Sequence, residues 1–143
     1  MQVHAVNYLA TIVTAIVIFM LGGLWYSPIG FSKRWLELQG KTEEQMKAEA
    51  AAANMPLLYL SALITSLLIA AVMALLIMHF SVVMPVNAAH GAIFGFMCWL
   101  GFAASTSYAT AVFSGNPKQL WLINSMYNLV CFVVAGIILS VWR

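Results

Sequence analysis

The chain contains no aspartate, and its charged residues of either sign make up only 7% of 143 residues. Soluble domains carry roughly 25% charged residues, so an ordinary soluble protein is excluded. The formal net charge of +2 is too small to predict a nucleic-acid partner. Cysteine is scarce as well. Cys98 and Cys131 both fall in apolar stretches, where small buried thiols are favoured over a disulfide.

Three long stretches lack any Asp, Glu, Lys or Arg, namely 1–32, 54–117 and 119–142, and 64% of the chain is hydrophobic. A helix crosses the hydrocarbon core with about 20 apolar residues, so these stretches suffice for four crossings. They are continuously apolar and lack the alternation of barrel strands. We therefore expect an all-α integral membrane four-helix bundle forming a single transmembrane domain over 1–143 in the lipid bilayer, with spans at about 3–26, 57–80, 86–110 and 119–142.

The connection at about 27–56 is the one sizeable soluble segment. Phe31, Trp35 and Leu38 recur at helical spacing beside charged residues, which predicts a short interfacial helix. Thr42 and Gln45 form a capping box that opens a second helix, which Pro56 should interrupt. Residues 114–117 predict a tight turn, so the last two spans should form an antiparallel hairpin.

Positive charges predict the orientation of the spans. Five Lys and Arg residues lie in the first and third connections, none lies at 81–85, and Arg143 alone favours the opposite orientation. The positive-inside rule therefore places both termini on the non-cytoplasmic side. No Lys or Arg precedes the first span. A signal peptide carries positive charge before its apolar core, so we interpret this span as a retained helix rather than a cleaved signal.

Two groups of residues suggest a family. The first half contains Gly23, Leu24, Trp25, Tyr26, Ser27, Pro28, Phe31, Lys33, Trp35, Gly40 and 42–44; the second contains Gly101, Phe102, Phe113, Gly115, Pro117, Asn124, Tyr127 and Leu129. Together they resemble domain of unknown function 1761, a family of small bacterial four-span membrane proteins. The resemblance implies the topology and a bacterial inner membrane, but no activity. Position 128 is Asn, where the family pattern leads us to expect His, which disfavours a role there that requires protonation.

The most specific part of this pattern is aromatic. Trp and Tyr gather at membrane interfaces, and a proline just past a helix end fits a break at that boundary. The alternative is an aromatic ligand platform at the cytoplasmic mouth of the bundle. The residues concerned are Trp25, Tyr26, Ser27, Pro28 and Trp35.

Polar residues recur at helical spacing on two spans. Asn7, Thr11 and Thr14 share a face of the first span, and Asn124 and Asn128 share a face of the fourth. Such residues can form hydrogen bonds between helices, each contributing about 1 kcal/mol. The alternative is a polar cavity that contacts a small neutral or zwitterionic solute. Its candidate residues are Tyr108, Asn124, Tyr127 and Asn128.

Two further sets of residues are candidates for contacts or ligands. Gly91 and Gly95 have the small-xxx-small spacing of a close helix contact, either within the bundle or between subunits. His4, His79 and His90 come from three spans, and three imidazoles could bind zinc or copper. However, no HxxxH or CxxC spacing is present, so we expect neither a metal nor another cofactor.

The motifs disfavour an enzyme. The spans contain no Asp or Glu, and the chain has no nucleophile-base arrangement and no phosphate-binding glycine loop. Ion-coupled transport is disfavoured too, because coupled transporters usually place ionisable residues at mid-depth in the membrane and the spans of this chain have none there. We expect a non-enzymatic module that forms a homo-oligomer or binds another membrane protein. The alternative is a passive transporter, a channel subunit or a binding protein for a small solute.

Overall fold

The computed structural model describes residues 5–142. Its elements are α1 (Tyr8–Trp25), α2 (Ser32–Leu38), α3 (Glu43–Ala52), α4 (Met55–Phe80), α5 (Ala88–Cys98), the π-helix η1 (Trp99–Ala104), α6 (Ser105–Phe113) and α7 (Lys118–Val141). No strand occurs among these residues, which confirms the all-α prediction. Four helical segments are long and apolar enough to cross a bilayer: α1, α4, the rod from α5 to α6, and α7. The chain is a multi-pass membrane protein.

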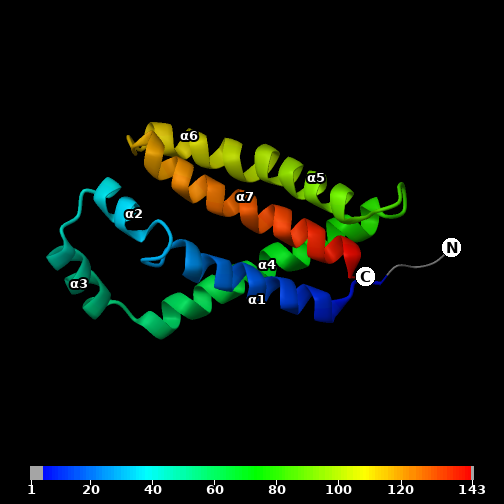
Figure 1. Cartoon of the computed structure of the whole chain (residues 1–143), viewed down its shortest axis with the longest axis horizontal. Coiled ribbons are helices and arrows are strands. Elements are labelled where there is room, and N and C mark those ends of the chain that lie inside the picture. Colours follow the sequence, from blue (N-terminus) through cyan, green and yellow to red (C-terminus); the bar gives the residue numbers. More distant parts are fainter. Residues whose placement is uncertain (1–4, 143) are drawn as a thin grey trace.

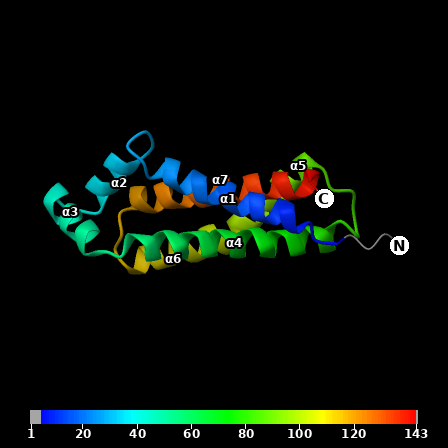
Figure 2. The ribbon, with the colours of Figure 1, turned by 90° about the horizontal axis from the view of Figure 1, so that it is seen from below.

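Helix α7 has the most partners in the bundle. It packs against α5, η1 and α6 on one side and against α1 and α4 on the other, and α2 also contacts it. Figure 1 shows the hairpin of α5, α6 and α7 above the pair α1 and α4. Figure 2 places α2 and α3 at the end of the bundle opposite the C-terminus. The predicted hairpin of the last two spans is confirmed, with Gly115 at a φ of 68° in its turn.

The capping residues set the helix boundaries, which differ from the predicted ones. The first helix starts at Tyr8 rather than near residue 3 because Asn7 is its N-cap, its side chain accepting from the Ala10 backbone N–H at 3.0 Å. The predicted capping box of Thr42 and Gln45 is confirmed. Pro56, expected to interrupt a helix, instead lies in the first turn of α4, where no backbone N–H is needed.

Glycines allow α5 and α7 to approach closely. A Cβ built on Gly91 would collide with the backbone oxygen of Gly136, and one on Gly95 with that of Phe132. A Cβ on Gly136 would in turn collide with Gly91. Small residues at such a position let helix backbones touch in a membrane. The face predicted from Gly91 and Gly95 is therefore a contact within the chain.

A π-helical turn separates α5 from α6. The six residues Trp99–Ala104 form η1, and the Trp99 indole N–H donates to the Ser125 backbone oxygen on α7 at 2.9 Å. One extra residue in a helix rotates everything after it by about 100°, because an α-helix has 3.6 residues per turn. The turn therefore decides which face of α6 meets α7.

The two threonines of α1 are buried but do not bridge helices. The Thr14 side chain donates to the Ala10 backbone oxygen at 2.7 Å, and Thr11 donates to that of Asn7 at 2.9 Å. The prediction that Thr11 and Thr14 form hydrogen bonds between helices was wrong, because a threonine hydroxyl in a helix can bond to the carbonyl four residues earlier. Both threonines serve as small packing residues instead.

Candidate functional site

Aromatic residues at the end of α1 and on α2 attach these elements to α7. The Trp25 indole N–H donates to the Ile123 backbone oxygen at 3.2 Å. The Tyr26 hydroxyl donates to Asn124 Oδ1 at 2.8 Å, and the Trp35 indole N–H donates to the same oxygen at 3.2 Å. The rings of Tyr26 and Trp35 also meet edge to face at 5.4 Å. We call Trp25, Tyr26, Trp35 and Asn124 the aromatic clamp.

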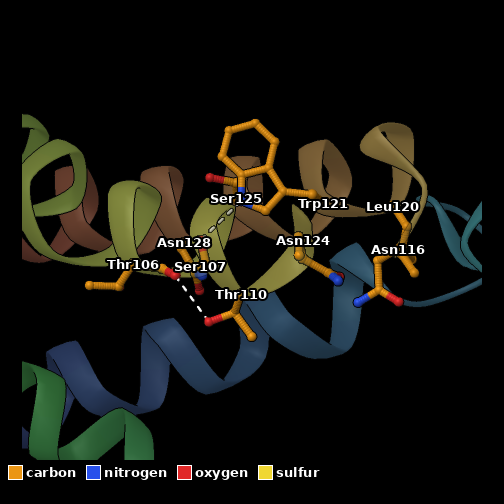
Figure 3. A pocket seen from close by; sticks show the side chains of 10 residues that line it. Thr106, Ser107, Thr110, Asn116, Leu120, Trp121, Asn124, Ser125 and Asn128 are labelled. Carbon is orange, nitrogen blue, oxygen red and sulfur yellow. Dashed lines mark hydrogen bonds between the residues drawn. The ribbon is translucent and has the colours of Figure 1, made fainter. Parts of the chain in front are cut away.

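The clamp fixes the orientation of the Asn124 carboxamide. An indole N–H can only donate, so the atom of Asn124 that faces Trp35 must be the oxygen. The oxygen then receives two hydrogen bonds, and the amide nitrogen keeps its own donors for other partners. In Figure 3 the Asn124 side chain extends towards that of Asn116.

A cavity of about 350 Å³ lies between α6 and α7, and Asn124 is part of its wall. At about 30 Å³ per molecule, it has room for on the order of ten waters. None of its lining residues carries a charge. They are Thr106, Ser107, Thr110 and Ala111 of α6, Asn116 of the turn, and Leu120, Trp121, Asn124, Ser125 and Asn128 of α7.

The hydroxyl groups of α6 are engaged as donors but keep acceptor capacity. Thr106 donates to the Phe102 backbone oxygen, and Thr110 donates to that of Thr106 at 3.1 Å. Ser107 Oγ accepts from the Trp121 indole at 3.0 Å, which ties α6 to α7 (Figure 3). A hydroxyl has two lone pairs, so Thr106 and Thr110 can each accept from a ligand.

Two uncharged polar side chains of α7, those of Ser125 and Asn128, have no hydrogen-bond partner within residues 5–142. Ser125 Oγ is buried, its residue only 1% exposed, and it makes no hydrogen bond. The carboxamide of the half-buried Asn128 makes none either. Asn128 lies ten residues past Lys118, or about 15 Å along a helix of about 36 Å. An amide without partners in a membrane interior is costly unless water or a ligand meets it.

The predicted solute residues separate into two groups. Asn124 and Asn128 both line the cavity, whereas Tyr108 and Tyr127 do not. The Tyr108 ring lies edge to face against Trp121 at 4.9 Å. Tyr127 points to α1, with its hydroxyl 3.4 Å from the Ile18 backbone oxygen.

The other predicted motif residues have local roles. Ser27 Oγ donates to the Leu24 backbone oxygen at 2.7 Å, which helps to end α1. Pro28 lies exposed in the following turn.

The histidines do not form a cluster in the part of the chain that is described. His4 lies outside it. His79 Nδ1 is 2.8 Å from the Leu75 backbone oxygen, and the His90 backbone N–H bonds the capping residue Asn87 at 3.0 Å. Residues 5–142 contain no group of three His, Cys, Asp or Glu side chains that could hold a metal ion.

Several cavity residues were missed from the sequence. Thr106, Ser107 and Thr110 occur in a Ser/Thr-rich run that could have drawn attention, and Ser125 is next to Asn124. Their facing positions depend on the register of η1. Hydropathy does not reveal a π-helical turn, so the face of α6 that meets α7 could not be assigned.

Comparison with known families gives a match that covers most of the chain. The family model described as "Protein of unknown function (DUF1761)" matches residues 9–140, which is nearly the whole chain. The chain belongs to the DUF1761 family. The match confirms the resemblance seen in the sequence. Both the aromatic clamp and the cavity of this DUF1761 protein lie within the matched region. No curated protein and no solved structure matches it.

Proposed function

We propose that this DUF1761 protein is a non-enzymatic membrane protein that binds a small, uncharged polar solute between α6 and α7. The observation behind the proposal is the free carboxamide of Asn128, at mid-depth in a helix and on the wall of a polar cavity. Ser125 belongs to the same wall, but its Oγ is buried away from solvent, so Asn128 is the group that a solute can reach. A solute with hydroxyl or amide groups would satisfy the Asn128 carboxamide.

The lining residues favour a neutral solute over a zwitterion. A zwitterion has two separated charges, and each would need a partner of opposite charge or water. The cavity offers amides and hydroxyls only. Its size, about 350 Å³, lies at the small end of ligand sites. We therefore propose a solute of a few non-hydrogen atoms, of which glycerol and urea are suitable probes.

The role expected from the sequence, an oligomerising or partner-binding module, loses one of its supports. It drew on Gly91 and Gly95 as one contact face, beside the polar helix faces and the basic connection. Because both glycines pack against α7 of the same chain, they are not free for that contact. Solute binding is the better supported proposal.

The orientation belongs to the same proposal. Lys33, Arg34, Lys41, Lys47 and Lys118 lie on α2, on α3, at the start of α7 and in the connections beside them. We infer from the positive-inside rule that this end, where α6 also finishes, faces the cytoplasm of a bacterial inner membrane. The cavity would then exchange solute with the cytoplasm. A reporter fused at the C-terminus tests this, since a cytoplasmic signal there contradicts it.

Binding can be tested by native mass spectrometry in lipid nanodiscs after incubation with glycerol or urea. The wild type should retain one solute per chain, and Asn128→Leu should lose it. Ser105→Ala is the matched control, because Ser105 lies on α6 outside the cavity and donates to the Gly101 backbone oxygen. Equal retention by Asn128→Leu and the wild type would contradict the proposal.

A further inference from the structure

A second, larger cavity lies on the other side of α7. It is a crevice of about 690 Å³ between α1, α4 and α7. Its α1 wall includes Phe19, Met20 and Gly23, and its α4 wall includes Tyr59 and Ile69. We call this cavity the lateral crevice.

The lateral crevice is lined by polar as well as apolar residues. Its polar residues include Asn128 and Tyr127 of α7, Tyr26 at the end of α1, and Thr65 and Ser66 of α4. The Tyr26 hydroxyl donates to Asn124, so its oxygen can still accept, and Asn128 is free to donate and to accept. Thr65 and Ser66 on the α4 wall donate to the Ala62 backbone oxygen of their own helix, which leaves Asn128 and Tyr26 as the polar groups that can bind a ligand head beside the apolar side chains of Phe19, Met20 and Ile69.

The α1 and α4 walls approach each other through aromatic rings. Tyr59 and Phe19 meet edge to face with ring centroids 6.4 Å apart. Both belong to helices that are apolar enough to cross a bilayer, and the first half of α4 is largely exposed. We therefore infer that the surface around these rings faces lipid chains.

The residues that line the lateral crevice disfavour a charged occupant. No lysine, arginine, histidine or glutamate lines it. A carboxylate or a phosphate in this position would lack a counter-charge, which is strongly unfavourable in a membrane interior. A head with hydroxyl groups would find both donors and acceptors.

We propose that the lateral crevice binds a single-chain amphiphile with an uncharged hydroxyl head, of the monoacylglycerol or long-chain alcohol class. The head contacts Asn128 and Tyr26, and the chain lies along Phe19, Met20 and Ile69 into the bilayer. This ligand differs from the small solute proposed for the cavity between α6 and α7. The two sites share the Asn128 side chain.

Gly23 provides a variant that fills the crevice. It lines the lateral crevice, and a Cβ built there meets no atom within 4 Å, so Gly23→Phe should be tolerated by the backbone. Gly101 on η1 is equally open, but it lines neither of the two cavities above nor an apolar one beside α4. Gly101→Phe is therefore the matched control. Neither substitution changes a residue of the cavity between α6 and α7.

The test uses photoreactive lipids in nanodiscs. A diazirine monoacylglycerol is compared with a diazirine fatty acid and a diazirine phosphatidylcholine, and labelled peptides are identified by mass spectrometry. We expect the monoacylglycerol to label peptides of α1 and α4 in the wild type and in Gly101→Phe, and unlabelled monoolein to compete. In Gly23→Phe this labelling should fall to the level seen with competitor.

Two results would overturn the proposal. One is equal labelling of these peptides by all three probes, which would mean that ordinary lipid fills the space. The other is full labelling of Gly23→Phe by the monoacylglycerol. Because Gly23→Phe leaves the cavity between α6 and α7 intact, its retention of glycerol or urea separates failure here from failure of the proposed solute site.

Discussion

The indole N–H of Trp35 on α2 donates to the carboxamide oxygen of Asn124 on α7 at 3.2 Å. The two residues are 89 positions apart in the chain. The Tyr26 hydroxyl uses the same oxygen, so one side chain of α7 holds both the end of α1 and the short helix after it. A residue on the wall of the proposed solute site is thereby connected to the segment outside the spans.

Replacing Asn124 by Ala should destabilise the protein. The change leaves the Tyr26 hydroxyl and the Trp35 indole without their acceptor, and we expect a loss of about 1–2 kcal/mol in the free energy of unfolding. Unfolding by denaturing detergent, followed by circular dichroism, measures this. Gln119→Ala is the control, because Gln119 accepts from Arg34 at the exposed surface and should change the free energy by less than about 0.5 kcal/mol. Equal losses in the two variants would argue against the clamp.

Alanine at Gly91, Gly95 or Gly136 should separate α5 from α7. The new methyl group meets backbone atoms of the facing helix, which cannot rotate away. We expect each variant to lose about 1–3 kcal/mol of stability, as overpacking does. Gly23→Ala and Gly101→Ala should instead be neutral or stabilising by up to about 1 kcal/mol, since both sites are open and alanine favours helices. The same detergent titration compares the five, and similar behaviour of both sets would show that the close contact is unimportant.

Ser125 and Ser107 should respond oppositely to alanine. Ser125 Oγ is buried without a partner among the described residues and out of reach of a solute, so Ser125→Ala should leave stability unchanged or raise it, and should leave solute binding unchanged. Ser107→Ala removes the acceptor of the Trp121 indole and should cost about 1 kcal/mol of stability. Thermal unfolding with and without glycerol or urea gives both quantities. A loss of stability in Ser125→Ala would contradict the absence of a hydrogen-bond partner for its hydroxyl.

Deleting Gly101 should abolish solute binding without preventing insertion into the membrane. The deletion removes one residue from η1 and turns Thr106, Ser107 and Thr110 by about 100° relative to α7. Native mass spectrometry of the nanodisc-embedded protein should then show no bound solute. Gly101→Ala keeps the residue count and should bind normally. Normal binding by the deletion variant would mean that the register of α6 does not set the site.

The fold could be predicted from the sequence because its strongest signal is the absence of charge. Three uncharged stretches predicted the spans, and Thr42 with Gln45 predicted the start of α3. The boundaries were less accurate, since Asn7 could be interpreted either as a cap or as part of a polar helix face. Its role depends on a local hydrogen bond that spacing does not reveal.

The candidate site was predictable only in part. Asn124 and Asn128 were predicted to share one face of α7, and both line the cavity. Tyr108 and Tyr127 were grouped with them but point elsewhere, Tyr108 because the π-helical turn sets which residues of α6 face the cavity. Gly136 was missed as the partner of Gly91 because it lies in an uninterrupted apolar run. Such pairings depend on the three-dimensional approach of distant segments.

The polar bonds of helix α3 join residues close to it in the chain. The helix has no buried residue, its capping box is internal, and Glu49 pairs with the nearby Lys41 at 2.7 Å. The aromatic clamp already holds α1 and α2 against α7 without it. The segment between Gln39 and Asn54 is consequently a natural insertion point: an epitope, a fluorescent protein or an affinity handle placed there leaves the bundle and both cavities intact.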